Sequence, residues 1–140
     1  SQKPLKCVCT VGADVPVLLG GTGRSAAAFL SDSELSRCIE TQKRIGNPVC
    51  GKEELRAVVK RTRSNGYYIS HSELDDAINA LGLPIFGKNG VVLGSLSIVA
   101  PSSRMSDEVT WELLPEARRS AQRISERMGY DGNMLNSKGE

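Results

Sequence analysis

The stretch ALGLPIFGKNGVVLGSLSIVA, residues 80–100, predicts the β-hairpin around which the rest of the chain is organised. Two apolar runs, residues 81–86 and 91–99, flank the pair Asn89 and Gly90. An Asn-Gly pair between apolar runs favours a type I′ turn, because both residues accept a positive φ. We therefore expect two antiparallel strands that are joined at this pair.

The two faces of the hairpin differ in chemistry, because successive side chains of a strand point to opposite faces. In the second strand the even-numbered positions are apolar or small and suit packing on helices. The odd-numbered positions place Ser95 and Ser97 between Leu93 and Val99. A sheet face of small and hydroxyl-bearing residues can be the floor of a pocket, although one face of an antiparallel sheet is often simply exposed to water. The hairpin alone leaves both interpretations open.

Length and composition indicate one ordinary globular domain. The chain has 140 residues, 39% hydrophobic and 24% charged, with a net charge of +2. A near-neutral charge and an aromatic content of 4% argue against nucleic-acid binding by this chain alone. Because no apolar run approaches the length of a membrane span and no signal-peptide pattern is present, we expect a cytoplasmic protein without membrane contact.

The cysteines do not form a recognisable metal motif. One residue lies between Cys7 and Cys9, whereas two residues lie between the paired cysteines of a zinc ribbon. Cys38 and Cys50 stand alone, and the single histidine, His71, is distant in sequence. This pattern favours reduced, packed thiols over a metal site. We expect no metal and no cofactor.

Hydrophobic periodicity outside the hairpin predicts further strands and helices. Pro115 is expected to kink the last helix or to mark where its regular part begins. Residues 72–79 are ambiguous, and a surface turn is preferred for Asp75 and Asp76. The expected elements are strands at residues 5–11 and 14–19, helices at 24–30, 31–42, 52–65 and 107–128, an extended segment at 67–70 and a polar tail at 131–140.

The sequence GGTG at residues 20–23 precedes the helix predicted at 24–30. Free N–H groups at a helix N-terminus, together with the positive end of the helix dipole, favour anion binding, and glycines let a ligand approach the backbone. The spacing matches neither a P-loop nor a dinucleotide-binding fingerprint. A plain connection between a strand and a helix is the alternative.

Taken in order, several segments resemble the effector-binding domain of IclR-type transcriptional regulators over roughly residues 14–130. No single motif carries the resemblance; the ordered set does. Its members are LGGTGRSAAAFL (19–30), GYYISHSE (66–73), LPIF (83–86), LSIVAPSSRM (96–105) and the C-terminal helix that ends in Met128-Gly129.

The resemblance implies a GAF- or profilin-like α+β domain, with a mostly antiparallel sheet, a central hairpin and packed helices. It implies an effector domain at residues 1–130, expected to lack its first strands, followed by the tail. Its partner would be a small organic acid that allosterically controls DNA binding by a separate winged helix-turn-helix domain outside this chain. A homodimer or homotetramer is also implied.

Carried over by position, the resemblance also implies a set of ligand contacts. Ser95 joins this set as a further hydroxyl on the same strand face. Two positions depart from the family pattern: Ala77 stands where glycine is usual, and Val99 stands where a polar residue is frequent. The implied ligand-binding residues are Gly21, Thr22, Glu73, Pro84, Ser95, Ser97 and Val99.

Two other functions compete with effector sensing. The chain could be an oligomerisation module that uses exposed apolar helix surface. It could also be a small enzyme with Cys9 or Cys50 as nucleophile and His71 as base. Because no third, orienting residue is evident, we expect that the chain is not an enzyme.

Overall fold

A three-stranded antiparallel sheet forms the centre of the computed structural model, which describes residues 10–132. The sheet contains β1 (Tyr68–His71), β2 (Ile78–Phe86) and β3 (Val92–Pro101), with β2 in the middle. The predicted hairpin and the extended segment before it are therefore confirmed. Strand β2 begins three residues earlier than expected, because its first residues also pair with β1.

The hairpin loop keeps the predicted backbone at its Asn-Gly pair but not the predicted turn type. Asn89 has a φ of 63° and Gly90 a φ of 75°, so both residues adopt the positive φ that the sequence indicated. The loop is nevertheless longer than a two-residue type I′ turn, since it contains the 3₁₀ turn η1 (Lys88–Gly90). The N–H of Gly87 closes this loop by donating to the carbonyl of Val91 at 2.8 Å.

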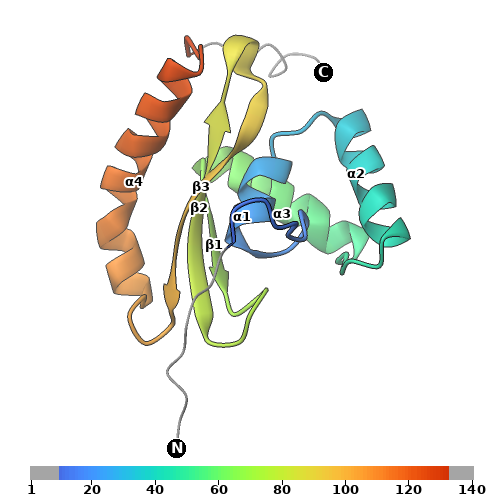
Figure 1. Cartoon of the computed structure of the whole chain (residues 1–140), viewed down its shortest axis with the longest axis horizontal. Coiled ribbons are helices and arrows are strands. Elements are labelled where there is room, and N and C mark those ends of the chain that lie inside the picture. Colours follow the sequence, from blue (N-terminus) through green and yellow to red (C-terminus); the bar gives the residue numbers. More distant parts are fainter. Residues whose placement is uncertain (1–9, 133–140) are drawn as a thin grey trace, which may run out of the picture.

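Helices cover both faces of the sheet (Figure 1). The long α4 (Asp107–Arg127) lies on one face, and α1 (Gly20–Ala27) lies on the other. Beyond α1 lie α2 (Asp32–Arg44) and α3 (Lys52–Asn65). The predicted α+β class, with an antiparallel sheet and packed helices, is confirmed.

The face that carries α4 is the apolar face predicted from the hairpin. Leu81 and Leu83 of β2 are almost fully buried against Leu114 and Ala117 of α4. Helix α4 continues through Pro115, so the expectation that its regular part begins there is wrong. Pro115 is exposed, and the carbonyl that it leaves without a donor can therefore be hydrated.

Local capping signals set the start of α2 and the end of α3 as predicted, but α2 ends at Arg44, two residues later than expected. The Oγ of Ser31 accepts from the N–H of Glu34 at 3.2 Å at the start of α2. Helix α3 ends at Gly66, which takes a left-handed φ of 80°.

The segment before α1 differs from its prediction. Residues 14–16 are irregular and residues 17–19 form a turn, so no strand is present there, and the helix expected to start at Arg24 starts at Gly20. Pro16 lacks an N–H for a ladder, and Gly23 lets the backbone of Pro16 and Val17 lie directly against α1. The strand predicted at residues 5–11 lies outside the described residues except for its last two, of which Val11 lies in a turn. The predicted tail is described only as far as residue 132.

Ala77, in the loop between β1 and β2, has a left-handed φ of 60°. This conformation costs an L-residue about 1–2 kcal/mol, and glycine avoids the cost but loses about 0.4–1 kcal/mol through unfolded-state entropy. Ala77→Gly is therefore expected to raise the free energy of unfolding in urea by roughly 0.5–1 kcal/mol. Ala57→Gly, an exposed position inside α3, is the matched control and should lower it by up to about 1 kcal/mol. Equal losses in both variants would contradict the assignment of strain to Ala77.

Candidate functional site

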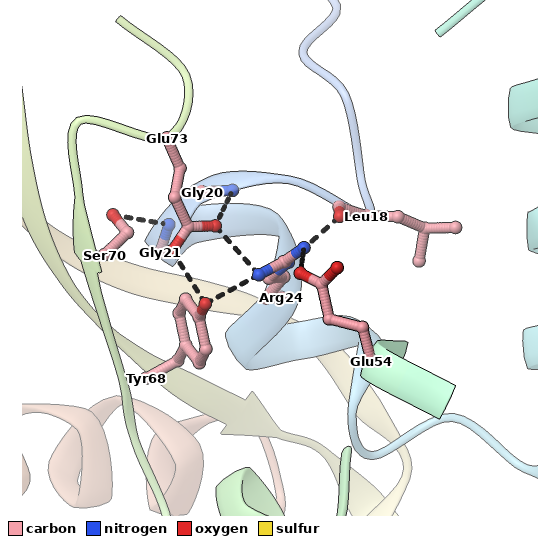
Figure 2. Close-up of polar contacts among 8 residues, drawn as sticks. All are labelled: Leu18, Gly20, Gly21, Arg24, Glu54, Tyr68, Ser70 and Glu73. Atoms are coloured by element: carbon pink, nitrogen blue, oxygen red, sulfur yellow. Dashed lines mark hydrogen bonds and ion pairs between the residues drawn. The ribbon is translucent and has the colours of Figure 1, made fainter. Parts of the chain in front are cut away.

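A buried arginine joins α1 to β1 and to the loop that follows β1 (Figure 2). Arg24 is only 5% exposed. Its Nη1 donates to the hydroxyl of Tyr68 at 2.7 Å and lies 2.9 Å from the carboxylate of Glu73. Its Nε donates to the carbonyl of Leu18 at 3.0 Å. A charge at this depth is tolerated because its donors find acceptors.

The carboxylate of Glu73 completes this cluster and caps α1. One of its oxygens accepts from the N–H of Gly20 at 3.3 Å, and the other accepts from the hydroxyl of Tyr68 at 2.7 Å. The N–H of Gly21 donates to the Oγ of Ser70 at 3.1 Å. The free N–H groups predicted at the glycine cluster are therefore already paired within the chain, that of Gly20 with a carboxylate.

Burial and hydrogen bonding shift two pKa values in the cluster. Burial raises the pKa of the Tyr68 phenol, the hydrogen bond to Glu73 raises it further, and Arg24 opposes these effects. Burial alone would lower the pKa of Arg24, but the hydrogen bond to Tyr68 and the charge of Glu73 raise it above its ordinary value. Both shifts move titration further above physiological pH, at which Arg24 is charged and Tyr68 is neutral.

The raised pKa of Tyr68 predicts a loss of stability at alkaline pH. The folded state holds the phenol proton more tightly than the unfolded chain, whose pKa is about 10. The stability contributed by neutral Tyr68 is thus complete below about pH 10 and is lost as the pH rises toward the folded-state pKa. Urea unfolding across this range should show the stability difference between wild type and Tyr68→Phe shrinking as the pH increases. Parallel curves would contradict the prediction.

A hollow of about 430 Å³ lies beside the cluster, between α1, α3 and the start of the sheet. Arg24, Tyr68 and Glu73 form its inner wall. Two charged residues of α3 line the outer part of the hollow. Glu54 lies 3.4 Å from Arg24 and its side chain is 60% exposed, and Arg61 is also exposed. The hollow thus brings two arginines and two glutamates together, and its one buried cation, Arg24, is ion-paired with both glutamates.

The hydroxyl-bearing face of the sheet lies under α1. A Cβ on Gly82 would fall 2.1 Å from the carbonyl oxygen of Gly21, so helix and strand meet here without side chains between them. The Oγ of Ser95 donates to the carbonyl of Thr22 at 2.9 Å. At Gly82 this face is therefore neither an open pocket floor nor a wet surface, since packing against α1 occupies it.

The seven predicted ligand residues divide into two groups. Glu73, Gly21 and Thr22 meet at the N-terminus of α1, and Ser95 reaches them through its bond to Thr22. Of the seven, only Glu73 lines the hollow. The strand residues Pro84, Ser97 and Val99 lie apart from it: Pro84 is buried, Val99 is 39% exposed, and the Oγ of Ser97 is buried without a hydrogen-bond partner among the described residues.

Sequence reasoning missed Arg24 and Tyr68. Arg24 is the one charged residue in the helix GGTGRSAA, and a lone arginine among small residues is a usable signal of a buried ion pair. Tyr68 belongs to a tyrosine pair of which it alone is buried, and the alternation in β1 indicates this only once the inner face is known.

The two strand serines make a matched pair for a stability test. Ser95→Ala removes the bond to Thr22 and should cost about 0.5–1.5 kcal/mol. Ser97→Ala removes a buried hydroxyl that has no partner in the part of the chain that is described, so it should leave stability unchanged or raise it by up to about 1 kcal/mol. Denaturant titration of both variants measures the difference. A larger loss for Ser97→Ala would show that its hydroxyl is bonded in solution.

Other candidate chemistry finds no support in the described residues. Within residues 10–132 no group of three or more histidine, cysteine or acidic side chains could hold a metal ion. Cys38 and Cys50 are free thiols, and His71 pairs with Asp107 at 2.7 Å on the surface. Cys7 and Cys9 lie outside the described residues. None of the helices between residues 10 and 132 has the length and hydropathy to cross a membrane.

Comparison with known proteins gives one consistent family. The family model of the C-terminal domain of the bacterial transcriptional regulator IclR matches residues 1–126. The HTH-type transcriptional regulator KdgR of Escherichia coli is 26% identical over 133 residues, covering 93% of this chain and 51% of KdgR. KipR of Bacillus subtilis is 28% identical over 123 residues, covering 86% of this chain and 49% of KipR. The chain thus spans about half the length of these curated relatives.

Solved structures agree in fold. Pseudomonas aeruginosa HmgR superposes with a TM-score of 0.78 at 27% identity, covering 94% of this chain and 53% of HmgR. The C-terminal domain of E. coli KdgR superposes with a TM-score of 0.70 at 26% identity, covering 82% of this chain and 72% of that domain. These relatives are named as regulators and not as enzymes, so the cysteine-dependent enzyme is set aside. The chain belongs to the family of IclR-type bacterial transcriptional regulators and corresponds to their C-terminal domain.

Proposed function

We propose that this domain senses a small organic acid and thereby controls DNA binding by a winged helix-turn-helix domain outside this chain. The observation that carries the proposal is the buried Arg24, which lines a hollow of about 430 Å³ next to the N-terminus of α1. An arginine that is fixed by Tyr68 and Leu18 and already holds the carboxylate of Glu73 has the geometry to bind the carboxylate of a ligand. Regulation follows if the acid binds one conformation of the domain better than another.

The proposed effector domain spans residues 1–130 and acts in the cytoplasm. Its ligand contacts centre on Arg24, Tyr68 and Glu73, which line the hollow, and the contacts implied on the strands form a second group that lies apart from it. Ser97 supports this assignment, because its buried hydroxyl has no partner among the described residues. The ligand residues proposed from the sequence are Gly21, Thr22, Glu73, Pro84, Ser95, Ser97 and Val99.

The proposed assembly is a homodimer or homotetramer. Regulators of paired DNA half-sites mirror the two-fold symmetry of the operator, and this chain would supply part of that symmetric assembly. Contact with DNA is assigned to the separate domain, since this chain has a net charge of only +2.

Metabolite retention tests the proposal directly. The purified domain is incubated with a mixture of small acids and neutral analogues, washed and analysed for what it retains, and the affinity of each retained compound is then measured by calorimetry. We expect retention of an acid, and a loss of affinity of ten-fold or more in Arg24→Gln, which removes about 1.4 kcal/mol or more of charge-assisted binding. Retention of neutral compounds alone, or of no compound, would contradict effector sensing by acids.

A further inference from the structure

We propose that Glu73 is an internal ligand of the effector site, and that a monocarboxylate binds by taking its place on Arg24, Tyr68 and Gly20. This inference rests on the proposed function, since it specifies how the acid enters and what it displaces. In the structure the site is closed by a carboxylate that belongs to the chain itself (Figure 2).

The donors around Glu73 match a planar carboxylate rather than a particular side chain. Nη1 of Arg24 lies 2.9 Å from Oε1, and the N–H of Gly20 lies 3.3 Å from the same oxygen. The hydroxyl of Tyr68 donates to Oε2 at 2.7 Å. Both oxygens are thus engaged by donors from a guanidinium, an amide and a phenol, which would serve the two oxygens of a free carboxylate equally well.

Glu73 is placed so that it can leave, whereas Arg24 is not. The side chain of Glu73 is 21% exposed and borders the hollow, and the side chain of Arg24 is 6% exposed. Glu73 lies in an irregular loop between β1 and β2 whose residues Ser72 and Ala77 both have a positive φ. A carboxylate that swings out of the site reaches water, whereas the guanidinium stays in place at the wall of the hollow.

The buried charge of Arg24 couples this movement to ligand binding. If Glu73 left without a replacement, Arg24 would retain the carbonyl of Leu18, the hydroxyl of Tyr68 and its longer ion pair, at 3.4 Å, with Glu54, whose side chain is 60% exposed. Loss of the shorter of its two ion pairs is costly for a buried charge, so the open state is rare without an anion. An incoming monocarboxylate supplies the missing charge and makes the open state favourable.

The ends of the loop confine the movement to its middle. The N–H of Ser72 donates to the carbonyl of Ile78 at 2.9 Å, and the carbonyl of Ala77 accepts from the N–H of Ser102 at 2.7 Å. Leu74, beside Glu73, is 45% exposed and would be 3.5 Å from a Cβ placed on Gly20. Displacing Glu73 therefore uncovers the first turn of α1 without unpairing β1 from β2.

The test uses sodium acetate as the probe, because it is a monocarboxylate without further groups. Acetate affinity and the amide resonances of Gly20 and Gly21 are measured for wild type, Glu73→Ala, Glu73→Gln and Asp76→Asn. Asp76, an exposed carboxylate of the same loop, is the matched control. We expect Glu73→Ala to bind acetate about ten-fold or more tightly than wild type, because the closed state no longer competes. Glu73→Gln should gain less, and Asp76→Asn should not differ from wild type.

Equal acetate affinity in wild type and both Glu73 variants, or binding that leaves the Gly20 amide unchanged, would overturn the proposal. If a Glu73 variant is unfolded in a buffer whose only anion is chloride, refolding of that variant by acetate would support the proposal, and failure to refold would overturn it.

The two proposals fail in different ways. If acetate binds at Gly20 in the Glu73 variants but wild type retains no acid, the proposed displacement of Glu73 stands and the proposed effector sensing is rejected. If an acid binds wild type without shifting the Gly20 and Gly21 amide resonances, the proposed effector sensing stands and the proposed displacement of Glu73 is rejected.

Discussion

Arg24→Met is expected to destabilise the domain by about 3 kcal/mol. Breaking a buried ion pair costs about 3–5 kcal/mol when one partner is left without compensation. The lower end applies here, because the remaining carboxylate of Glu73 is 21% exposed and can reach water. Methionine fills much of the space of the arginine stem but cannot donate to the carbonyl of Leu18 or to the hydroxyl of Tyr68.

Urea denaturation of Arg24→Met and Arg61→Met separates this effect from the general loss of an arginine. Arg61 borders the same hollow but is exposed, so its substitution should change the free energy of unfolding by no more than about 0.5 kcal/mol. Similar small changes in both variants would mean that the buried cluster does not stabilise the fold.

Gly82→Ala should have a comparable or larger effect, with a loss of at least about 3 kcal/mol, at the upper end of the usual cost of overpacking. The added Cβ would lie 2.1 Å from the carbonyl oxygen of Gly21 and 2.5 Å from the Oγ of Ser25. The backbone oxygen cannot rotate away, so α1 would have to lift from the sheet. This displacement would also strain the hydrogen bonds of Gly20 to Glu73 and of Gly21 to Ser70.

Gly94→Ala provides the matched control for Gly82→Ala, since Gly94 lies in the neighbouring strand and a Cβ there would meet no atom within 4 Å. Thermal and urea unfolding should place Gly94→Ala within about 0.5 kcal/mol of wild type. If the two variants unfold alike, the close approach of α1 to β2 does not exist in solution.

Local signals in the sequence were sufficient for most of the secondary structure. The serine before α2 and the glycine after α3 specify helix ends through hydrogen bonds and backbone conformations within a few residues. The alternation in the hairpin correctly assigned Leu81 and Leu83 to the dry face, because the period of a strand is a local property. The turn type was predicted wrongly, since the length of a loop also depends on how the flanking strands pair.

The glycine cluster shows where local reasoning ended. Glycines before a helix were interpreted as room for a ligand or as a plain connection. In the structure, Gly23 accommodates the backbone of Pro16 and Val17, and Gly21 packs on Ala80 of β2. A glycine in the sequence indicates that another group approaches the backbone closely, but it does not identify that group.

The hairpin, the start of α2 and the whole of α3 could therefore be predicted from the sequence by itself, because periodicity and capping operate over short distances along the chain. The α+β class followed from the family resemblance, which ordered motifs carry. Only the tertiary structure decided that α1 covers the hydroxyl-bearing face and that Glu73 closes its N-terminus. The contacts responsible join residues that are far apart in the sequence: 53 positions separate Gly20 from Glu73, and 44 separate Arg24 from Tyr68. A buried charge can choose its partners only after the chain has brought them together, and for this reason the central residues of the site, Arg24 and Tyr68, were not identified from the pattern of the sequence.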